Sequence, residues 1–252
     1  MAADEADVGR LRLARETVLE RIAAACGRAT RPPSDVTLVA VSKTVPVERI
    51  RAGVAAGLTT LGENRVQEAE GKIGEVSGAT WHLVGPLQKN KARRALEVFA
   101  VIESVDSLAL AERLDRIADD VRPTDRVLVL LQVNVDEDPS KAGFMPAELE
   151  ASLGTILELP RLDVRGLMTI GRQVARPEDA RPTFAALREL SQRLRGADGR
   201  LGPALSMGMT DDFEVAVEEG ATIVRVGRAL FGERPHDHGD GPHVHEAGDQ
   251  RL

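Results

Sequence analysis

Residues 36–44 read VTLVAVSKT, an apolar and β-branched run that ends abruptly in Ser42, Lys43 and Thr44. Such a run is typical of a strand that is buried on both faces. This strand would place the amine of Lys43 at its buried end, where a cation is unfavourable unless it has a specific partner or function. The spacing alone leaves two interpretations open: an amine that reacts with a carbonyl compound, or a cation paired with a nearby carboxylate such as Glu63.

Similar runs recur along the chain and alternate with helical periods. The predicted strands are residues 36–41, 59–63, 80–85, 100–105, 126–135, 162–171, 203–209 and 221–227. A leading amphipathic helix is predicted over 6–28, and the later helical segments are 45–57, 64–76, 88–99, 107–120, 147–159, 177–195 and 211–220. Continuous apolar strands separated by helices predict a parallel sheet that is covered on both faces. Eight such units in about 230 residues favour a single (β/α)₈ TIM barrel over an open doubly wound sheet.

The composition argues against several classes of binding partner and indicates where the protein works. The chain has 252 residues, 42% of them hydrophobic, and a formal net charge of −7, which argues against a nucleic-acid or anionic-membrane surface. Its one cysteine, Cys26, excludes an internal disulfide, fits a reducing compartment and lies on an apolar helical face, so we expect it in the core. No run reaches membrane-spanning length, and no apolar stripe suggests an interface. We therefore expect a cytoplasmic monomer.

Residues 6–232 contain no linker or low-complexity stretch, which predicts one barrel domain. Residues 233–252 are rich in Gly, Pro, Asp and His and hold almost no apolar residue, so we expect a disordered tail. Four of the five histidines fall there: His236, His238, His243 and His245. A His-x-His pair can bind a metal adventitiously, but nothing around it builds a closed site, and we predict no metal centre.

Barrels of this kind carry their functional groups on the loops that follow the strands, and the loops after strands 7 and 8 commonly bind phosphate. SMGMTDD (206–212) follows the seventh predicted strand and VRVGRALFG (224–232) contains the eighth. Their glycines let the backbone approach an anion closely. Ser206 and Thr210 add hydroxyls, and Gly227 and Arg228 add backbone N–H groups. We expect a phosphate at these two loops.

A phosphate held there and an amine on the next strand around a closed ring suit one small phosphorylated aldehyde. Pyridoxal 5′-phosphate has this anatomy, and its aldehyde would condense with Lys43 as a Schiff base. Arg225 would then meet the ring nitrogen. A permanent cation disfavours protonation of that nitrogen, so the cofactor would be a weaker electron sink than one paired with a carboxylate.

Seven stretches in order resemble the pyridoxal phosphate homeostasis protein family, a group of stand-alone barrels similar to the N-terminal domain of alanine racemase. They are LVAVSKT (38–44), LGENRVQE (61–68), WHLVGPLQKNK (81–91), SVD (104–106), GLMTIG (166–171), SMGMTDDFEVAVEEGAT (206–222) and VRVGRALFG (224–232). The resemblance covers about residues 8–233. It implies that Lys43 carries the internal aldimine, that Asn64 and Arg225 lie near the cofactor ring, and that Ser206 and Gly227 hold the phosphate.

The predicted cofactor-binding residues are Lys43, Asn64, His82, Met168, Ser206, Met207, Thr210, Arg225, Gly227 and Arg228. Two of them depart from the family's pattern. The family often has serine at the position of Thr210, which keeps a hydroxyl. It commonly has a small or hydroxyl residue at the position of Arg228, so we expect a phosphate contact from its backbone N–H rather than from its side chain.

Catalysis is not expected. Racemisation on such a barrel needs two bases, one on each face of the bound amino acid. In alanine racemase the second base is a tyrosine from another domain of the partner subunit, and this chain contains neither that domain nor any tyrosine. We predict no catalytic residues and a module that holds, buffers and delivers pyridoxal phosphate to apo-enzymes. The alternatives are a racemase of low turnover and a Schiff-base aldolase that acts on sugar phosphates.

Overall fold

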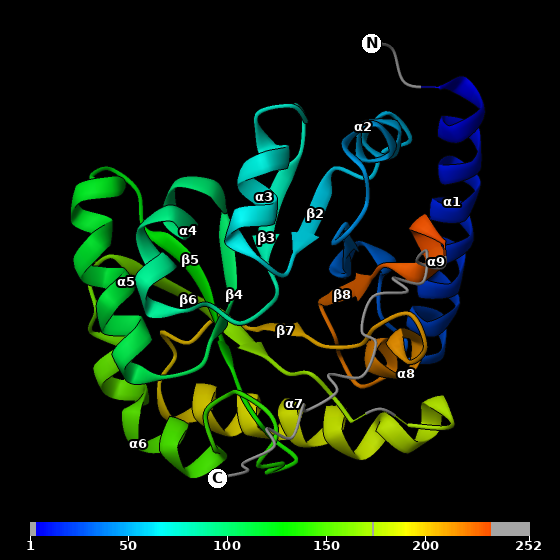
Figure 1. Cartoon of the computed structure of the whole chain (residues 1–252). Helices are drawn as coiled ribbons and strands as arrows, with labels where there is room; N and C mark the ends of the chain where they lie inside the picture. Colours follow the sequence, from blue (N-terminus) through cyan, green and yellow to red (C-terminus); the bar gives the residue numbers. More distant parts are fainter. Residues whose placement is uncertain (1–3, 173, 233–252) are drawn as a thin grey trace, which may run out of the picture.

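The computed structural model describes residues 4–172 and 174–232, and its centre is a closed barrel of eight parallel strands in chain order (Figure 1). The strands are β1 (Thr37–Val41), β2 (Thr60–Glu63), β3 (Thr80–Leu83), β4 (Val101–Val105), β5 (Val127–Gln132), β6 (Leu162–Met168), β7 (Ala204–Ser206) and β8 (Ile223–Val226). Each lies inside a predicted strand. The predicted (β/α)₈ barrel is therefore confirmed.

The ring closes between the first and last strands. β1 pairs with β8 over four residues, from Thr37 opposite Ile223 to Ala40 opposite Val226. β7 pairs with β8 only where Ser206 lies opposite Ile223. Because the strands are parallel, the loops after β1, β7 and β8 open at the same end of the barrel.

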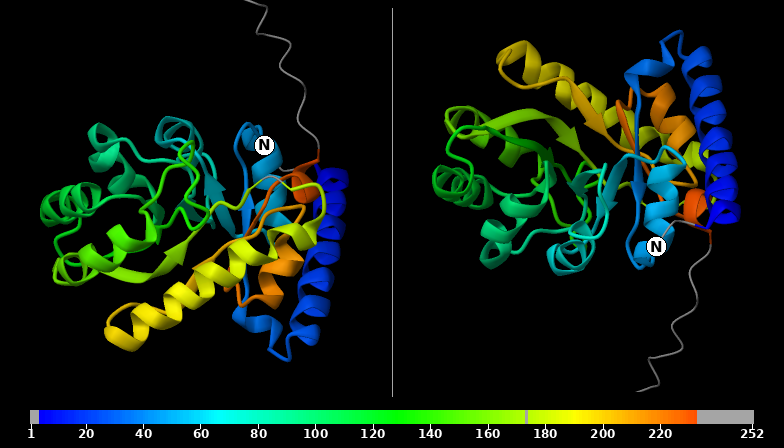
Figure 2. Two further views of the ribbon diagram at one scale, coloured as in Figure 1. Left: turned by 90° about the horizontal axis from the view of Figure 1, so that it is seen from below. Right: turned by 90° about the horizontal axis from the view of Figure 1, so that it is seen from above.

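The helices surround the barrel. They are α1 (Glu5–Arg28), α2 (Val47–Ala55), α3 (Val66–Ile73), α4 (Ala92–Val98), α5 (Leu108–Val121), α6 (Pro146–Leu157), α7 (Arg181–Ala197), α8 (Phe213–Glu218) and α9 (Arg228–Phe231). Three short 3₁₀ helices accompany them: η1 (Pro33–Asp35), η2 (Lys89–Lys91) and η3 (Pro177–Ala180). The long helix α1 precedes the barrel and packs along α2, α8 and α9, as Figures 1 and 2 show.

Local chemistry sets several boundaries of these elements. Asp4 accepts the N–H of Ala6 at the start of α1, and Ser107 accepts the N–H of Leu110 at the start of α5, as expected for side-chain N-caps. The predicted strand 203–209 ends earlier, at Ser206, because Gly208 has φ +90° and turns the chain toward α8. A Cβ at Gly208 would lie 2.5 Å from the Cβ of Ala216, so this turn requires glycine.

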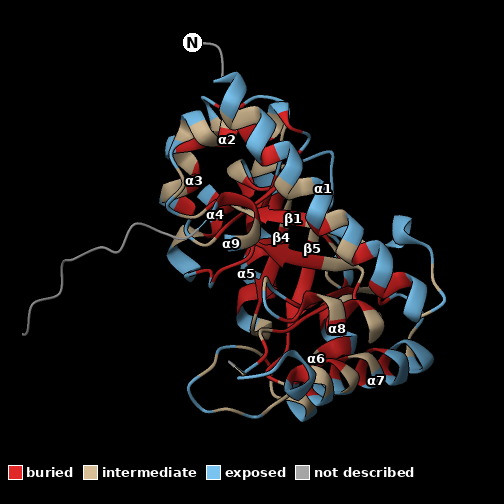
Figure 3. Cartoon of the chain, turned by 90° about the vertical axis from the view of Figure 1, so that its right-hand side faces the viewer, coloured by how far each residue is buried: buried red, intermediate tan, exposed pale blue. Residues whose placement is uncertain are grey.

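Burial follows the barrel architecture. In Figure 3 the strands are mostly buried, and the exposed residues lie mainly on the outer faces of the helices and on loops. Cys26 is fully buried in the core, as predicted, and burial raises the pKa of its thiol. Among the described residues, no helix is long and apolar enough to cross a membrane. The predicted tail (233–252), with its four histidines, lies outside the described residues.

Candidate functional site

A cavity of about 330 Å³ lies at the end of the barrel where the strands deliver their loops. It is bounded by residues that follow or end β1, β2, β3, β6, β7 and β8. The lining residues are Val41, Lys43, Asn64, Val84, Gly85, Pro86, Ile170, Met209, Thr210, Asp211, Arg225, Gly227 and Arg228. Small-molecule sites commonly begin at about 300 Å³, so the cavity suits a ligand of a few rings or fewer.

Six of the ten predicted site residues line this one cavity: Lys43, Asn64, Thr210, Arg225, Gly227 and Arg228. They come from the ends of four strands, β1, β2, β7 and β8, which the ring closure brings together. An amine, a hydroxyl, an amide and two guanidinium groups thus border the same space. This is the donor set that a phosphorylated carbonyl compound would need.

The other four predicted residues are His82, Met168, Ser206 and Met207, which are buried and do not line the cavity. Contacts from them to a cofactor stay predictions. Two residues that were not predicted, Ile170 and Met209, line the cavity instead of the two buried methionines. Both lie beyond the last residues of β6 and β7, so the period of two in a strand does not reveal them.

The buried polar residues form a hydrogen-bonded chain across the barrel interior. His82 Nδ1 lies 2.6 Å from Glu103 Oε1, and the Ser206 hydroxyl donates to Glu103 Oε2 at 2.5 Å. Arg225 donates from one terminal nitrogen to Ser206 Oγ at 2.6 Å and from the other to the carbonyl oxygen of Thr169 at 2.8 Å. These bonds link β3, β4, β7 and β8 and hold the Arg225 guanidinium at the inner side of the cavity.

Charge and burial both shift the pKa values of the groups in this hydrogen-bonded network. Burial tends to raise the pKa of Glu103, but the hydrogen bond from His82, the charge of Arg225 and the hydroxyl of Ser206 lower it overall. Burial lowers the pKa of Arg225, while Glu103 and Asp212 oppose that shift. An arginine keeps its charge at neutral pH, so the cavity has a fixed cation at its inner side.

The loops after β7 and β8 are tied to one another. Arg228 donates to the carboxylate of Asp211, an ion pair that links the two loops. Asp212 accepts the N–H of Met209 at 2.6 Å and stands at the N-cap of α8. Because the side chain of Arg228 is engaged with Asp211, its backbone N–H remains the better candidate for an anion contact.

The loop after β3 packs tightly against the loop after β2. A Cβ at Gly85 would lie 2.4 Å from the carbonyl oxygen of Asn64 and 2.7 Å from its Cα. Only glycine permits this approach, which sets the position of Asn64 at the cavity. The Gly-Pro pair at 85–86 was the sequence signal for it, although neither residue was among the predicted contacts.

Within the described residues, no three His, Cys, Asp or Glu side chains lie together so as to hold a metal ion. The donor set of the cavity consists of one amine, neutral hydrogen-bond donors, and cations suited to an anion.

Comparison with known proteins agrees with this geometry. Residues 17–235 match the family model described as "Alanine racemase, N-terminal domain". The alanine racemase of Clostridium difficile superposes with a TM-score of 0.70 at 15% identity, over 91% of this chain and 58% of that one, which shows the shared fold alone.

Closer relatives share sequence as well as fold. The curated "Pyridoxal phosphate homeostasis protein" of Aquifex aeolicus is 44% identical over 87% of this chain and 96% of its own length, and that of Escherichia coli K12 is 40% identical over 87% and 94%. The structure of PipY from Synechococcus elongatus with pyridoxal phosphate (PLP) bound has a TM-score of 0.74 at 44% identity, over 85% of this chain and 100% of PipY. The chain therefore belongs to the pyridoxal phosphate homeostasis protein family, whose barrel is that of the alanine racemase N-terminal domain.

Proposed function

We propose that this chain binds pyridoxal 5′-phosphate and holds it through the amine of Lys43. The observation that carries the proposal is the shared cavity, in which Lys43 borders the same space as Thr210, Arg225 and Gly227. The relative PipY, which has been solved with PLP bound, and the curated relatives named for pyridoxal phosphate homeostasis support it.

The lysine inventory supports Lys43 as the attachment point. The chain has only five lysines, all within the described residues, and Lys43 is the one that lines this cavity. Lys72 is buried, and its ammonium donates to three acceptors. Lys141 donates to the carbonyl oxygen of Ile170, and Lys89 and Lys91 lie in η2.

Each lining residue has a role that its chemistry suits. The cofactor would supply an aldehyde, with which the Lys43 amine would condense to a C=N bond with the loss of one water. Thr210 and the backbone of Gly227 and Arg228 would donate to the phosphate. The fixed charge of Arg225, at the inner side of the cavity, would disfavour protonation of the ring nitrogen. The Ser206 hydroxyl already donates to Glu103, so a phosphate contact from it would require that bond to break.

The role we propose is to hold, buffer and deliver the cofactor inside the cell, with apo-enzymes as recipients, rather than to catalyse a reaction. Proton transfer on both faces of a bound amino acid needs a second base. The chain has no tyrosine to provide one. The names of the curated relatives describe homeostasis rather than a reaction, which supports the same role.

Peptide mapping tests the attachment site. The protein is incubated with pyridoxal phosphate, reduced with borohydride to make the C–N bond permanent, digested and analysed by mass spectrometry. We expect a pyridoxyl group on Lys43 at near-full occupancy and little on the other four lysines. Modification spread evenly over the lysines, or absent from Lys43, would contradict the proposal.

A second assay tests the carrier role. Amino acids are incubated with the loaded protein in deuterated water, and exchange of the α-proton is followed by NMR over many equivalents of substrate. The proposed role predicts no sustained exchange. Multiple turnovers that disappear in Lys43→Ala would show a racemase-type enzyme instead.

A further inference from the structure

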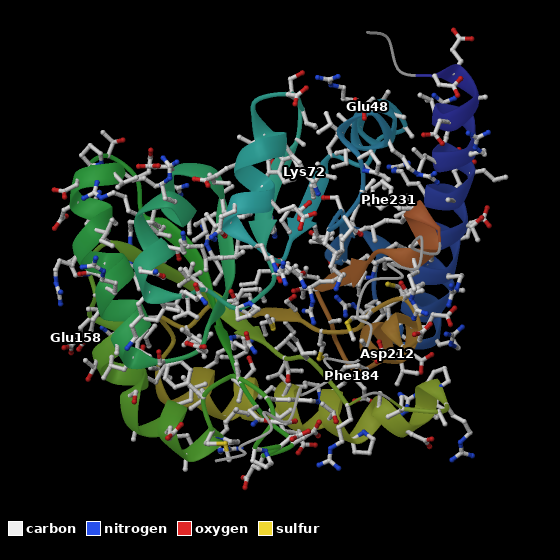
Figure 4. The ribbon with its side chains drawn as sticks, in the orientation of Figure 1. Glu48, Lys72, Glu158, Phe184, Asp212 and Phe231 are labelled. Atoms are coloured by element: carbon white, nitrogen blue, oxygen red, sulfur yellow. The ribbon has the colours of Figure 1, made fainter. Side chains whose placement is uncertain are left out.

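The residues on both sides of Lys43 are tied to one buried ammonium group, that of Lys72. Lys72 lies in the last turn of α3 and is only 8% exposed; it is labelled in Figure 4. Its Nζ donates to the carbonyl oxygen of Ser42 at 2.8 Å, to Glu63 Oε1 at 2.7 Å and to Glu68 Oε1 at 2.7 Å. All three N–H donors of the ammonium are therefore used.

Each acceptor either belongs to the turn that carries Lys43 or forms a hydrogen bond with it. The same oxygen of Glu63 accepts the Ser42 hydroxyl at 2.7 Å, so Ser42 is held through both its carbonyl and its side chain. The same oxygen of Glu68 accepts the backbone N–H of Thr44. Ser42 and Thr44 are the two neighbours of Lys43 in the chain. One cation thus restrains the peptide groups before and after the lysine.

This restraint acts on a strained backbone. Thr44 has φ +64°, a left-handed conformation that a β-branched residue rarely adopts. Such a conformation is strained and persists only where the surroundings hold it. The surroundings here are the Glu68 carboxylate on the Thr44 N–H and the Thr44 hydroxyl on the Lys43 carbonyl at 2.6 Å. Without them the turn would relax and carry Lys43 with it.

We propose that Lys72, with Glu63 and Glu68, is a positioning clamp that holds the Ser42–Lys43–Thr44 turn so that the Lys43 amine meets the carbonyl of its ligand. The inference rests on the proposed role of Lys43. Lys72 itself does not line the cavity; it acts through the backbone and through the two carboxylates. A displacement of about 1 Å at a reacting group can lower a rate about 100-fold, which is the scale of effect that such a clamp controls.

The charge balance explains why the clamp is a lysine. Glu63 is fully buried, and burial raises the pKa of its carboxyl group while Lys72 and Ser42 oppose that shift. Glu63 and Glu68 each lie 2.7 Å from the same ammonium. Replacing Lys72 by a neutral residue would leave two neighbouring carboxylates without their shared cation, so one of them would move away or become protonated.

The test compares Lys72→Met with Arg122→Met, a matched control. Arg122, the residue after the last residue of α5, also donates to main-chain oxygens of a neighbouring segment, those of Leu96 and Phe99, and does not line the cavity. Stopped-flow absorbance measures the rate at which each folded variant forms the Schiff base with pyridoxal phosphate. We expect a 10- to 100-fold slower reaction for Lys72→Met, on the scale set by misplacement of a reacting group, and an unchanged rate for Arg122→Met.

A second readout needs no cofactor. Amide hydrogen exchange of Thr44, measured by NMR in the protein without cofactor, reports the bond to Glu68 directly. The clamp predicts faster exchange at Thr44 in Lys72→Met, with core amides of β5 unchanged. If the parent forms no Schiff base at all, the proposed function fails, and this exchange measurement alone decides whether the clamp exists.

If Lys72→Met does not fold, Glu68→Ala replaces it. The Glu68 side chain is 26% exposed, and its removal releases Thr44 while Lys72 keeps Ser42 and Glu63. We expect a smaller loss of rate in the same direction. Parent-like rates in folded Lys72→Met or Glu68→Ala, equal slowing in Arg122→Met, or unchanged exchange at Thr44 would each overturn the clamp.

Discussion

The Ser206 side chain links Glu103 to Arg225 in the buried hydrogen-bonded network. Its hydroxyl donates to one and accepts from the other, so Ser206→Ala leaves two buried charged groups each short of a partner. We expect the free energy of unfolding to fall by about 1–3 kcal/mol, the usual cost of unsatisfied buried groups. Urea denaturation of the cofactor-free protein measures it.

Ser104 on β4 provides the control for that prediction. It is equally buried, but its hydroxyl has no hydrogen-bond partner in the described structure. Ser104→Ala therefore removes a polar group that was not satisfied, and the free energy of unfolding should stay within about 0.5 kcal/mol of the parent or rise. Equal losses for the two serines would show that the Glu103–Ser206–Arg225 chain contributes no stability.

Ionisation of Glu103 should make the free energy of unfolding depend on pH in the acid range. Its folded-state pKa lies below the ordinary value of 4.5 because His82, Arg225 and Ser206 outweigh the effect of burial. A carboxyl whose pKa is lowered by folding contributes stability that is complete above 4.5 and is lost as the pH falls toward the lowered value. Glu103→Gln should flatten this acid limb in urea unfolding measured as a function of pH. An identical slope in the variant would contradict the assignment.

At the level of single residues, Lys43, Thr210 and Gly227 could be predicted at the cavity because a lysine, a hydroxyl and a glycine at strand exits have few structural reasons to be there. Met168 and Met207 are buried and do not line the cavity, whereas Ile170 and Met209 do. The sequence does not reveal this difference, because the last residue of each strand depends on backbone turns such as the one at Gly208. The hydrogen bond between Ser206 and Glu103 joins residues 103 positions apart, which no local pattern reveals.

At the level of elements, the close contact between the loops after β2 and β3 can be tested by adding one methyl group. Gly85→Ala would push against the backbone of Asn64, so we expect a loss of about 1–3 kcal/mol in unfolding free energy and weaker pyridoxal phosphate binding. Gly71→Ala in α3 meets open space and should instead gain about 0.5–1 kcal/mol, because alanine suits a helix better than glycine. Thermal melts and equilibrium binding measure both variants, and a harmless Gly85→Ala would contradict the packing described.

The order and type of elements could be predicted because apolar runs and helical periods alternate clearly through the chain. The ends of the strands could not. β5, β6 and β7 stop at Gln132, Met168 and Ser206, each three residues before the predicted end, because the apolar pattern continues into loops that pack on the barrel. The proposed clamp on Lys43 could not be predicted from the sequence either. Lys72 has the pattern of an ordinary helical lysine, and only the structure gives its three acceptors.

At the scale of the whole molecule, closure of the ring makes the site. Pairing of β1 with β8 brings the amine of Lys43 beside the loops after β7 and β8, although these segments lie at opposite ends of the barrel sequence (Figure 1). Ligand that binds only this assembled state must stabilise the fold, by about 2.7 kcal/mol at a free concentration 100 times the dissociation constant.

The most direct measurement is the visible absorbance of the purified protein after incubation with pyridoxal phosphate and desalting, beside Lys43→Ala and the exposed-lysine control Lys89→Ala. Our account predicts a yellow Schiff-base band in the parent and in Lys89→Ala, and its loss in Lys43→Ala, where any retained cofactor shows the spectrum of the free aldehyde. A colourless parent, or a band that persists unchanged in Lys43→Ala, would contradict the account.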